Sequence, residues 1–249
     1  MKFHIQDQVI RVAPRDTPRL LSVLSERLRA RRGFALATLN LDHLVKLRRD
    51  PAFLAAYMQH NLVVADGNPV VWLSRIAGRP VGLVPGADMV VPIARLAAEA
   101  GVSVALVGST EDALRAAGEG LCARVPGLVI AARVAPPMGF DPAGQQGAEV
   151  IAALRASGAG LCLLALGAPR QEILAARAHT ALPQMGFASI GAGLDFIAGV
   201  QSRAPLWMRR LALEWLWRAL TSPRRMLPRY ARCAAILPGL IIAAWRLRG

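Results

Sequence analysis

With 249 residues, the chain is long enough for one large domain, or for one domain with an appendage, and 54% hydrophobic residues supply a sizeable core. The formal net charge of +14 implies an anionic partner: nucleic acid, lipid headgroups or a phosphorylated ligand. Three scattered cysteines argue against a disulfide framework and a zinc site, and they fit a reducing cytoplasm.

The N-terminal segment lacks the uninterrupted apolar core of a signal peptide. From about residue 8 to 200, short apolar runs alternate with segments of helical periodicity. The runs are apolar throughout, as expected when helices cover both faces of a sheet, so we predict a Rossmann-like, mostly parallel α/β fold. The predicted strands are 34–38, 61–65, 103–108, 128–134, 160–166 and 186–190. The predicted helices include 17–31, 41–59, 87–100, 110–124, 143–157 and 170–181.

Beyond about residue 200 the composition changes, which divides the chain into a core (1–200) and a helical appendage rich in Arg and Trp (201–249). Residues 204–221 are expected to form an apolar helix, and Ser222-Pro223 is a typical helix start.

Two prolines, Pro228 and Pro238, are expected to interrupt the end of the appendage and leave short, kinked helices. The longest apolar run, 233–245, has thirteen residues. It is too short to cross a bilayer alone, which takes about 20 residues, but it fits a segment that lies on a membrane or dips into one.

Residues 203–232 hold eight arginines, three tryptophans and one acidic residue. As a nucleic-acid binder, this stretch would be unusual, because its tryptophans lie in an apolar helix and no recognised binding motif is present. As a core helix, it would bury several arginines at high cost. As an interfacial helix, it would place Trp, Leu and Met at the acyl boundary and Arg on lipid phosphates. We therefore predict an anionic membrane surface as a partner, and no nucleic acid.

Asp66 directly follows the predicted strand 61–65, at the edge of a parallel sheet where ligands bind. A carboxylate there can serve as a general base. Asp-Gly is also a very common turn dipeptide, so the spacing alone favours a plain turn at Asp66-Gly67.

The strand 160–166 leads into Gly167-Ala168-Pro169 and then into a helix that carries Gln171 and Glu172 in its first turn. Backbone N–H groups at a helix start suit an anion, and a side-chain amide can contact a base or a sugar hydroxyl. The alternative is a simple cap, with Glu172 interacting with the helix dipole.

Another glycine-rich turn, Gly191-Ala192-Gly193, follows the strand 186–190 and matches half of a dinucleotide-binding fingerprint. Phe196 stands where the third Gly or Ala belongs. We expect a turn that a nucleotide can approach closely, with Asp195 bonding to a ribose or a base. No P-loop is present.

Metal-binding motifs are absent from the sequence. There is no Asp-x-Asp, and the four histidines are isolated; His43, beside Asp42 at a helix start, is expected at the surface. We predict no metal and no cofactor. If the ligand is a nucleotide whose diphosphate departs, arginines would then have to neutralise that diphosphate in place of a metal ion.

Taken in order, these motifs resemble those of the WecG/TagA/CpsF family of bacterial glycosyltransferases. Each motif is short, but the ordered set, from about residue 5 to 232, is quite specific. It comprises Thr38-Leu39-Asn40, Ala65-Asp66-Gly67, Gly86-Ala87-Asp88, Leu166-Gly167-Ala168-Pro169-Arg170-Gln171-Glu172, Gly191-Ala192-Gly193-Leu194-Asp195, Arg203-Ala204-Pro205, Glu214-Trp215-Leu216-Trp217-Arg218 and Pro223-Arg224-Arg225.

One position departs from the family pattern. Members commonly carry Arg three residues before the Gly of Gly-x-Asp, where this chain has Leu83. Arg79, about one helical turn upstream, is a candidate substitute.

The resemblance implies an inverting transferase that moves a sugar from a UDP-sugar to a polyprenyl-diphosphate-linked saccharide in cell-surface polysaccharide synthesis. It implies a metal-independent, peripheral protein on the cytoplasmic face of the bacterial inner membrane, docked there by its C-terminal appendage. The donor sugar stays open among N-acetylmannosamine, its uronic acid, glucose and others, and a homo-oligomer is compatible with the sequence.

For single residues, the resemblance implies Asp66 as the catalytic base, with Thr38 and Asn40 in the same pocket. The remaining candidates are expected to contact the UDP-sugar or to stabilise its departing diphosphate. They are Gly67, Gly108, Gly167, Pro169, Gln171, Glu172, Gly191, Asp195, Arg218, Arg224 and Arg225.

The main alternative is a membrane-associated nucleotide-binding regulator without catalytic activity, which would bind UDP but release none from a donor. A Rossmann oxidoreductase is disfavoured by the broken fingerprint and by the missing acid for the ribose.

Overall fold

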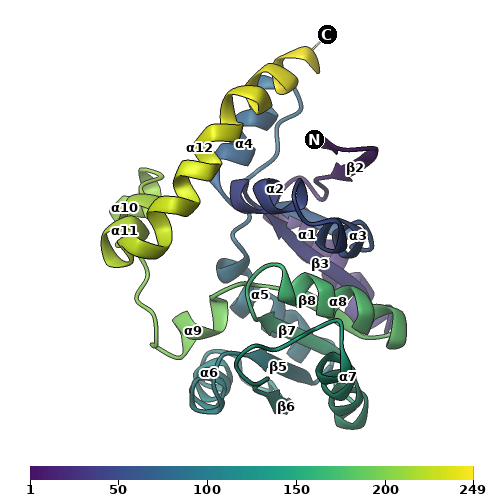
Figure 1. Ribbon diagram of the computed structural model, residues 1–249. Helices are drawn as coiled ribbons and strands as arrows, with labels where there is room; N and C mark the ends of the chain where they lie inside the picture. Colours follow the sequence, from purple (N-terminus) through teal and green to yellow (C-terminus); the bar gives the residue numbers. More distant parts are fainter. Residues whose placement is uncertain (249) are drawn as a thin grey trace.

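The computed structural model describes residues 1–248, with Arg210 described by its backbone only, and is centred on a six-stranded parallel sheet (Figure 1). This confirms the predicted α/β class and all six predicted strands. The strand order is β4-β3-β8-β7-β5-β6. The strands are β3 (Phe34–Leu39), β4 (Leu62–Ala65), β5 (Val104–Gly108), β6 (Ile130–Val134), β7 (Leu161–Ala165) and β8 (Gly186–Ser189).

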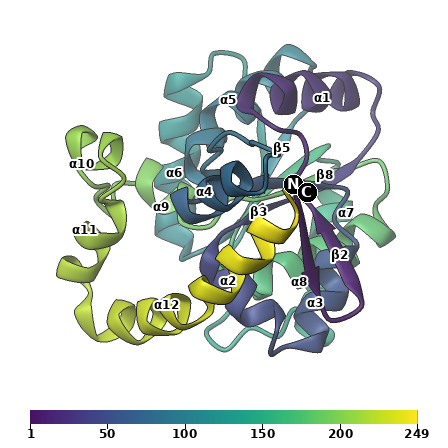
Figure 2. The same ribbon diagram turned by 90° about the horizontal axis from the view of Figure 1, so that it is seen from above.

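Helices cover both faces of this sheet (Figure 2). One face packs against α1 (Thr17–Arg29), α5 (Gly86–Glu99), α6 (Glu111–Arg124) and α9 (Gly193–Ile197). The other face packs against α2 (Leu41–Leu47), α3 (Pro51–Met58), α7 (Gln145–Ser157) and α8 (Arg170–Ala181). Alternate strand residues feed the two cores, which explains why the strands read as continuous apolar runs.

The helix predicted at 41–59 is two helices, α2 and α3. Asp50 breaks it, because its side chain accepts a hydrogen bond from the N–H of Phe53 at 2.9 Å and caps α3, which begins at Pro51. Proline at the first position of a helix needs no N–H partner, so the sequence Asp-Pro starts a new helix.

Two elements near the chain start were not predicted. β1 (Lys2–Ile5) and β2 (Gln8–Arg11) form an antiparallel hairpin whose apolar side chains join the core beside α4 (Asn68–Ile76). Only four residues long each, these strands alternate apolar and polar residues too briefly to give a periodic signal.

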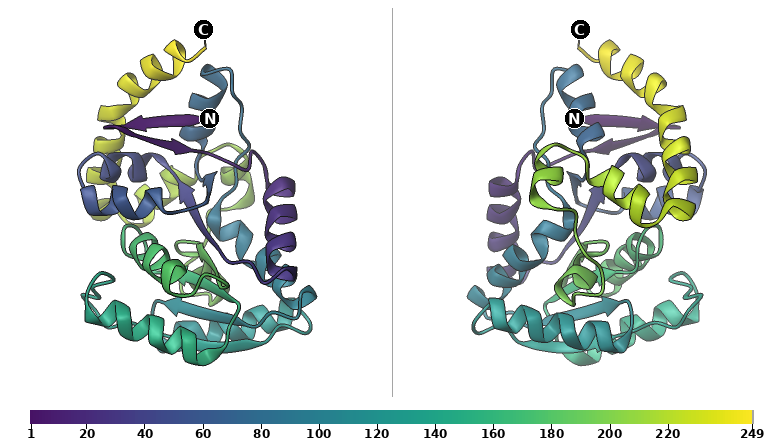
Figure 3. Two further views of the ribbon diagram at one scale, coloured as in Figure 1. Left: turned by 90° about the vertical axis from the view of Figure 1, so that its right-hand side faces the viewer. Right: turned by 90° about the vertical axis from the view of Figure 1, so that its left-hand side faces the viewer.

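The appendage contains α10 (Leu206–Arg210), α11 (Glu214–Thr221) and α12 (Pro223–Arg246), which lie outside the sheet layers (Figures 1 and 3). The single helix predicted at 204–221 is therefore two, separated by a turn in which Ala212 has a φ of 60°. The division of the chain at residue 200 stays a prediction.

The expected interruption of α12 at Pro228 and Pro238 is wrong, because the helix runs through both. Each proline removes one backbone hydrogen bond. Packing offsets this loss: α12 lies along α2 and α4, where Leu240 and Ala244 are buried in the core.

By length and composition, α12 is long and apolar enough to cross a bilayer, with a mean hydropathy of 1.3 over its most apolar window. The thirteen-residue run considered above is thus only part of a 24-residue helix. Crossing a bilayer would, however, strip Leu240 and Ala244 from the core, so the structure favours a helix that lies against the protein.

Candidate active site

All six strands point the same way, so their carboxyl ends meet at one edge of the sheet. Asn40 follows β3, Asp66 follows β4, Gly191 follows β8 and Gly167 follows β7, while Gly108 ends β5. Sequence-predicted site residues from five strands therefore share the edge where α/β proteins bind ligands.

Asp66 is partly buried at this edge and receives hydrogen bonds from the side chains of Thr38 and Asn40. Burial raises the pKa of Asp66 to about 6. The positive charge of Arg218 opposes this shift, the negative charge of Glu214 adds to it, and the two hydrogen bonds oppose it. Such a carboxylate is mostly ionised at neutral pH yet basic enough to accept a proton.

The geometry around Asp66 depends on two glycines. Gly67 has a φ of +132°, which side chains rarely adopt, and it turns the chain sharply from Asp66 into α4. Gly86 begins α5, and a Cβ there would lie 3.0 Å from Cγ2 of Thr38 and 3.3 Å from Cα of Ile190. The start of α5 therefore closes tightly on β3 and β8.

Asn40 links the site to α2. Its Oδ1 accepts from the backbone N–H of His43 at 3.0 Å and caps that helix. The carbonyl side of the amide is thus occupied, which orients its NH₂ group as the donor to Asp66.

His43 was expected at the surface, and that expectation is wrong: the side chain is buried. Its Nδ1 lies 2.6 Å from the carbonyl oxygen of Thr38, and the hydroxyl of Tyr57 donates to the same oxygen at 3.1 Å. Burial lowers the pKa of His43 to about 4, so the ring is neutral. It supports the backbone of Thr38 and has no exposed face to offer a substrate.

Within the turn after β7, the polar groups bond to one another. The Gln171 amide accepts from the N–H of Gly167 at 3.2 Å and donates to Glu172 at 2.8 Å. Both side chains are buried, and burial raises the pKa of Glu172 to about 7. A cis peptide joins Ala168 to Pro169. In this structure the two side chains shape the turn, and their contact with a nucleotide stays a prediction.

The glycines after the other strands differ in their surroundings. A Cβ on Gly108 would lie 2.5 Å from the carbonyl oxygen of Ala165 in the next strand, and one on Gly193 would lie 2.5 Å from Val90 of α5. Gly191 has a φ of +58° with open space around it. Asp195, in α9, accepts from Gln201 at 2.8 Å. Strand and helix packing therefore accounts for Gly108 and Gly193, while Gly191 leaves room for a ligand.

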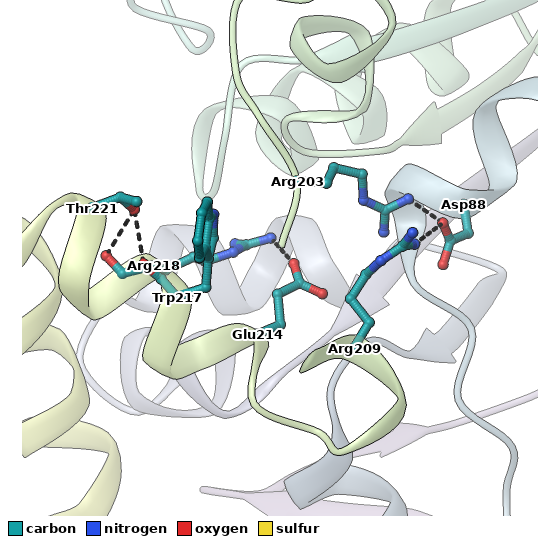
Figure 4. A network of polar contacts seen from close by, with 7 residues as sticks. All are labelled: Asp88, Arg203, Arg209, Glu214, Trp217, Arg218 and Thr221. Carbon is teal, nitrogen blue, oxygen red and sulfur yellow. Dashed lines mark hydrogen bonds and ion pairs between the residues drawn. The ribbon is translucent and has the colours of Figure 1, made fainter. Parts of the chain in front are cut away.

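The arginines of the appendage approach this edge in two groups (Figure 4). Arg203 forms an ion pair with Asp88 in the first turn of α5, and Arg209 lies 3.9 Å from the same carboxylate. Arg218 lies 2.6 Å from Glu214, one helical turn away on α11. Asp88 and the two arginines that reach it were not among the predicted site residues, although Gly86-Ala87-Asp88 and Arg203 belong to matched motifs.

Arg79, the candidate substitute for the arginine expected at position 83, is exposed three residues beyond α4, and its taking over that role stays a prediction. Burial lowers the pKa of the Met1 amino group, as do the charges of Arg15 and Arg79, so Arg79 lies near the chain start. Leu83 is exposed. Asp88 receives its positive partners from the appendage.

Two further predicted arginines, Arg224 and Arg225, are exposed in the first turn of α12. Within residues 1–248, no three His, Cys, Asp or Glu side chains gather as a metal site would require. An open hollow of about 390 Å³ lies at the opposite edge of the sheet, next to Gly160 and Met185. None of the residues that line it carries a carboxylate or an imidazole.

Comparison with known proteins identifies the family of this chain. The glycosyl transferase WecG/TagA/CpsF family matches the chain over residues 8–249. A protein of Bacillus spizizenii, named N-acetylglucosaminyldiphosphoundecaprenol N-acetyl-beta-D-mannosaminyltransferase, is 27% identical over 206 residues, which cover 80% of this chain and 77% of the relative. The chain belongs to the WecG/TagA/CpsF family of glycosyl transferases.

Proposed function

We propose that the chain transfers a sugar, with inversion, from a UDP-sugar to a polyprenyl-diphosphate-linked saccharide, using Asp66 as the general base. The observation that carries the proposal is the environment of Asp66: a carboxylate with a pKa of about 6, held by Thr38 and Asn40 beside a guanidinium. A base needs a positioned carboxylate, and a departing diphosphate needs positive charge close by.

In the proposed reaction, ionised Asp66 removes the proton from an acceptor hydroxyl. That oxygen attacks the anomeric carbon from the face opposite the UDP. The bond between the anomeric carbon and the diphosphate oxygen breaks, and its electron pair leaves with UDP. Arg218 is the cation whose charge lowers the pKa of the base, and the exposed Arg224 and Arg225 are available to the diphosphate. Three arginines give the charge that other transferases take from a divalent ion.

For the substrates, the name of the Bacillus relative supports transfer of N-acetylmannosamine onto N-acetylglucosaminyl-diphosphate-undecaprenol. Leu83, where the resemblance led us to expect Arg, leaves room for a related sugar or acceptor in this chain.

Membrane binding at the cytoplasmic face is part of the proposal, since the acceptor would be anchored in lipid. Of fifteen large apolar side chains exposed among the described residues, nine belong to the appendage, Trp207, Trp215 and Trp245 among them. Exposed arginines of α12 accompany them, a combination suited to anionic headgroups. The three cysteines are free, in keeping with a reducing compartment.

A panel of UDP-sugars tests the proposal, with UDP release measured in the presence of a short-chain prenyl-diphosphate-linked N-acetylglucosamine. The proposal requires UDP release from at least one donor that depends on this acceptor, including after treatment with a chelator. Binding of UDP without release from any donor would instead support the non-catalytic regulator.

A further inference from the structure

One side of α12 is buried against the core, and it carries a single charge. Met226, Cys233, Leu240 and Ala244 are the buried residues of this helix, and their spacing places them on one face. Arg229 falls on the same face, between Met226 and Cys233. The other arginines in the first half of α12 are exposed: Arg224, Arg225 and Arg232.

On the core side, Arg229 meets Asp42 in the first turn of α2. The Nε of Arg229 lies 3.0 Å from Oδ1 of Asp42, whose side chain is only 11% exposed. A buried carboxylate is costly without cationic partners, so this contact is specific in a way that a solvated surface pair is not.

Asp42 has a second cation beside it. The Nζ of Lys46 lies 2.9 Å from Oδ2 of Asp42, although without the alignment of a hydrogen bond, and it donates to the carbonyl of Ala168 at 2.9 Å. One carboxylate therefore joins α12 to α2, the helix capped by Asn40, and through Lys46 to the turn after β7.

The same part of α12 also packs against α11. Tyr230, next to Arg229, meets the ring of Trp215 edge-on, with centroids 6.0 Å apart. Trp215 is in the turn of α11 that precedes Arg218, the cation beside Asp66. Contacts thus run from Asp42 through α12 to α11, the helix that carries the charge acting on Asp66.

We propose that Asp42 is a positioning residue: by binding Arg229 it seats α12 on the core, and through α12 it holds α11 and Arg218 against Asp66. The consequence for catalysis rests on the function proposed above, whereas the seating of the appendage does not. Charge balance makes the prediction specific. Asp42→Asn leaves Lys46 and Arg229 facing each other without an anion, whereas Arg229→Gln leaves Asp42 its Lys46 partner.

The test is a double-mutant cycle of Asp42→Asn and Arg229→Gln in the full chain, followed by hydrogen exchange and by UDP release. Exchange in residues 214–221 should be fastest in Asp42→Asn, intermediate in Arg229→Gln, and slower in the double variant than in Asp42→Asn, since removing the second cation relieves the repulsion. Exchange in the central strands should not change. Arg229→Lys keeps the charge and should restore slow exchange.

For turnover, kcat should fall roughly tenfold in Asp42→Asn, the order expected for losing one charge-assisted contact, with KM for the donor nearly constant. Asp112→Asn is the matched control. Asp112 is also in the first turn of a helix and lies 2.6 Å from Arg115, but its side chain is far more exposed than that of Asp42. It should change neither measurement. Additive effects in the cycle, or wild-type exchange in residues 214–221 of Asp42→Asn, would overturn the proposal. If the substitutions change exchange as expected but the wild type shows no sugar transfer, the proposal that Asp42 seats α12 would stand and only its catalytic consequence would be refuted.

Discussion

The pH dependence of turnover follows from the burial of Asp66. With a pKa of about 6, roughly one Asp66 in eleven is ionised at pH 5 and ten in eleven at pH 7. Since only the ionised carboxylate can accept the proton, kcat should rise about tenfold from pH 5 to 7 and then level off. An ordinary aspartate would already be at its plateau at pH 5.

Two single substitutions on α11 should shift the acidic limb of the profile, the rise of kcat between pH 5 and 7, in opposite directions along the pH axis. Glu214→Gln removes a negative charge that raises the pKa of Asp66, so the limb should shift to lower pH. Arg218→Gln removes the positive charge that lowers this pKa, so its limb should shift to higher pH and its plateau should fall. The assay is UDP release at saturating substrates from pH 4.5 to 8.5, with folding checked by circular dichroism at each pH. A flat profile down to pH 5, or shifts of the same sign in both variants, would refute the assignment of Asp66.

Three other predictions concern stability and membrane binding. Glu172→Gln should stabilise the fold. The pKa of Glu172 in the folded protein is about 7, so the wild type loses stability as the pH rises from about 4.5 to 7. At pH 8 its free energy of unfolding in urea should lie about 3 kcal/mol below that of the variant. An equal difference at pH 4 and pH 8 would disprove this. Gly67→Ala should cost about 1–3 kcal/mol because of its positive φ, and should lower kcat with it; an unchanged Tm would speak against a strained turn. Ile241, Ile242 and Trp245 are exposed, and replacing all three by serine should reduce the fraction of protein that co-sediments with phosphatidylglycerol vesicles without changing Tm. Undiminished binding would place the lipid contact elsewhere.

Much of the fold could be read from periodicity. The six strands are continuous apolar runs and the helices between them are amphipathic, which is sufficient to predict a parallel sheet covered on both faces. The failures have local causes. Asp50 and Pro51 start a helix inside a stretch that is apolar on both sides, and α12 persists through two prolines because tertiary packing outweighs the lost hydrogen bonds.

The site was predictable to the extent that strand ends mark it. Strand ends placed Thr38, Asn40 and Asp66 at this edge, but spacing alone favoured a plain turn at Asp66, and only the motif order indicated the roles of the three residues. The structure brings their side chains together. Contacts between distant segments could not be predicted from the sequence, because no local pattern indicates them. Asp88 pairs with Arg203 and Asp42 with Arg229, and each pair joins residues more than a hundred positions apart. His43 was misplaced because a helix start beside an acidic residue resembles a surface, whereas its ring packs under β3.

Sugar transfer by Asp66→Asn, compared with the wild type at pH 8 and with a chelator present, is the most direct test of a carboxylate base that works beside arginines. The variant keeps the size of the side chain and one acceptor oxygen for the hydrogen bonds of Thr38 and Asn40, so UDP should bind with a nearly unchanged Kd. The wild type should keep its full rate in the chelator, while kcat of the variant should fall about 10²–10⁴-fold. A variant within a few-fold of the wild type, or a wild type silenced by the chelator, would contradict the account.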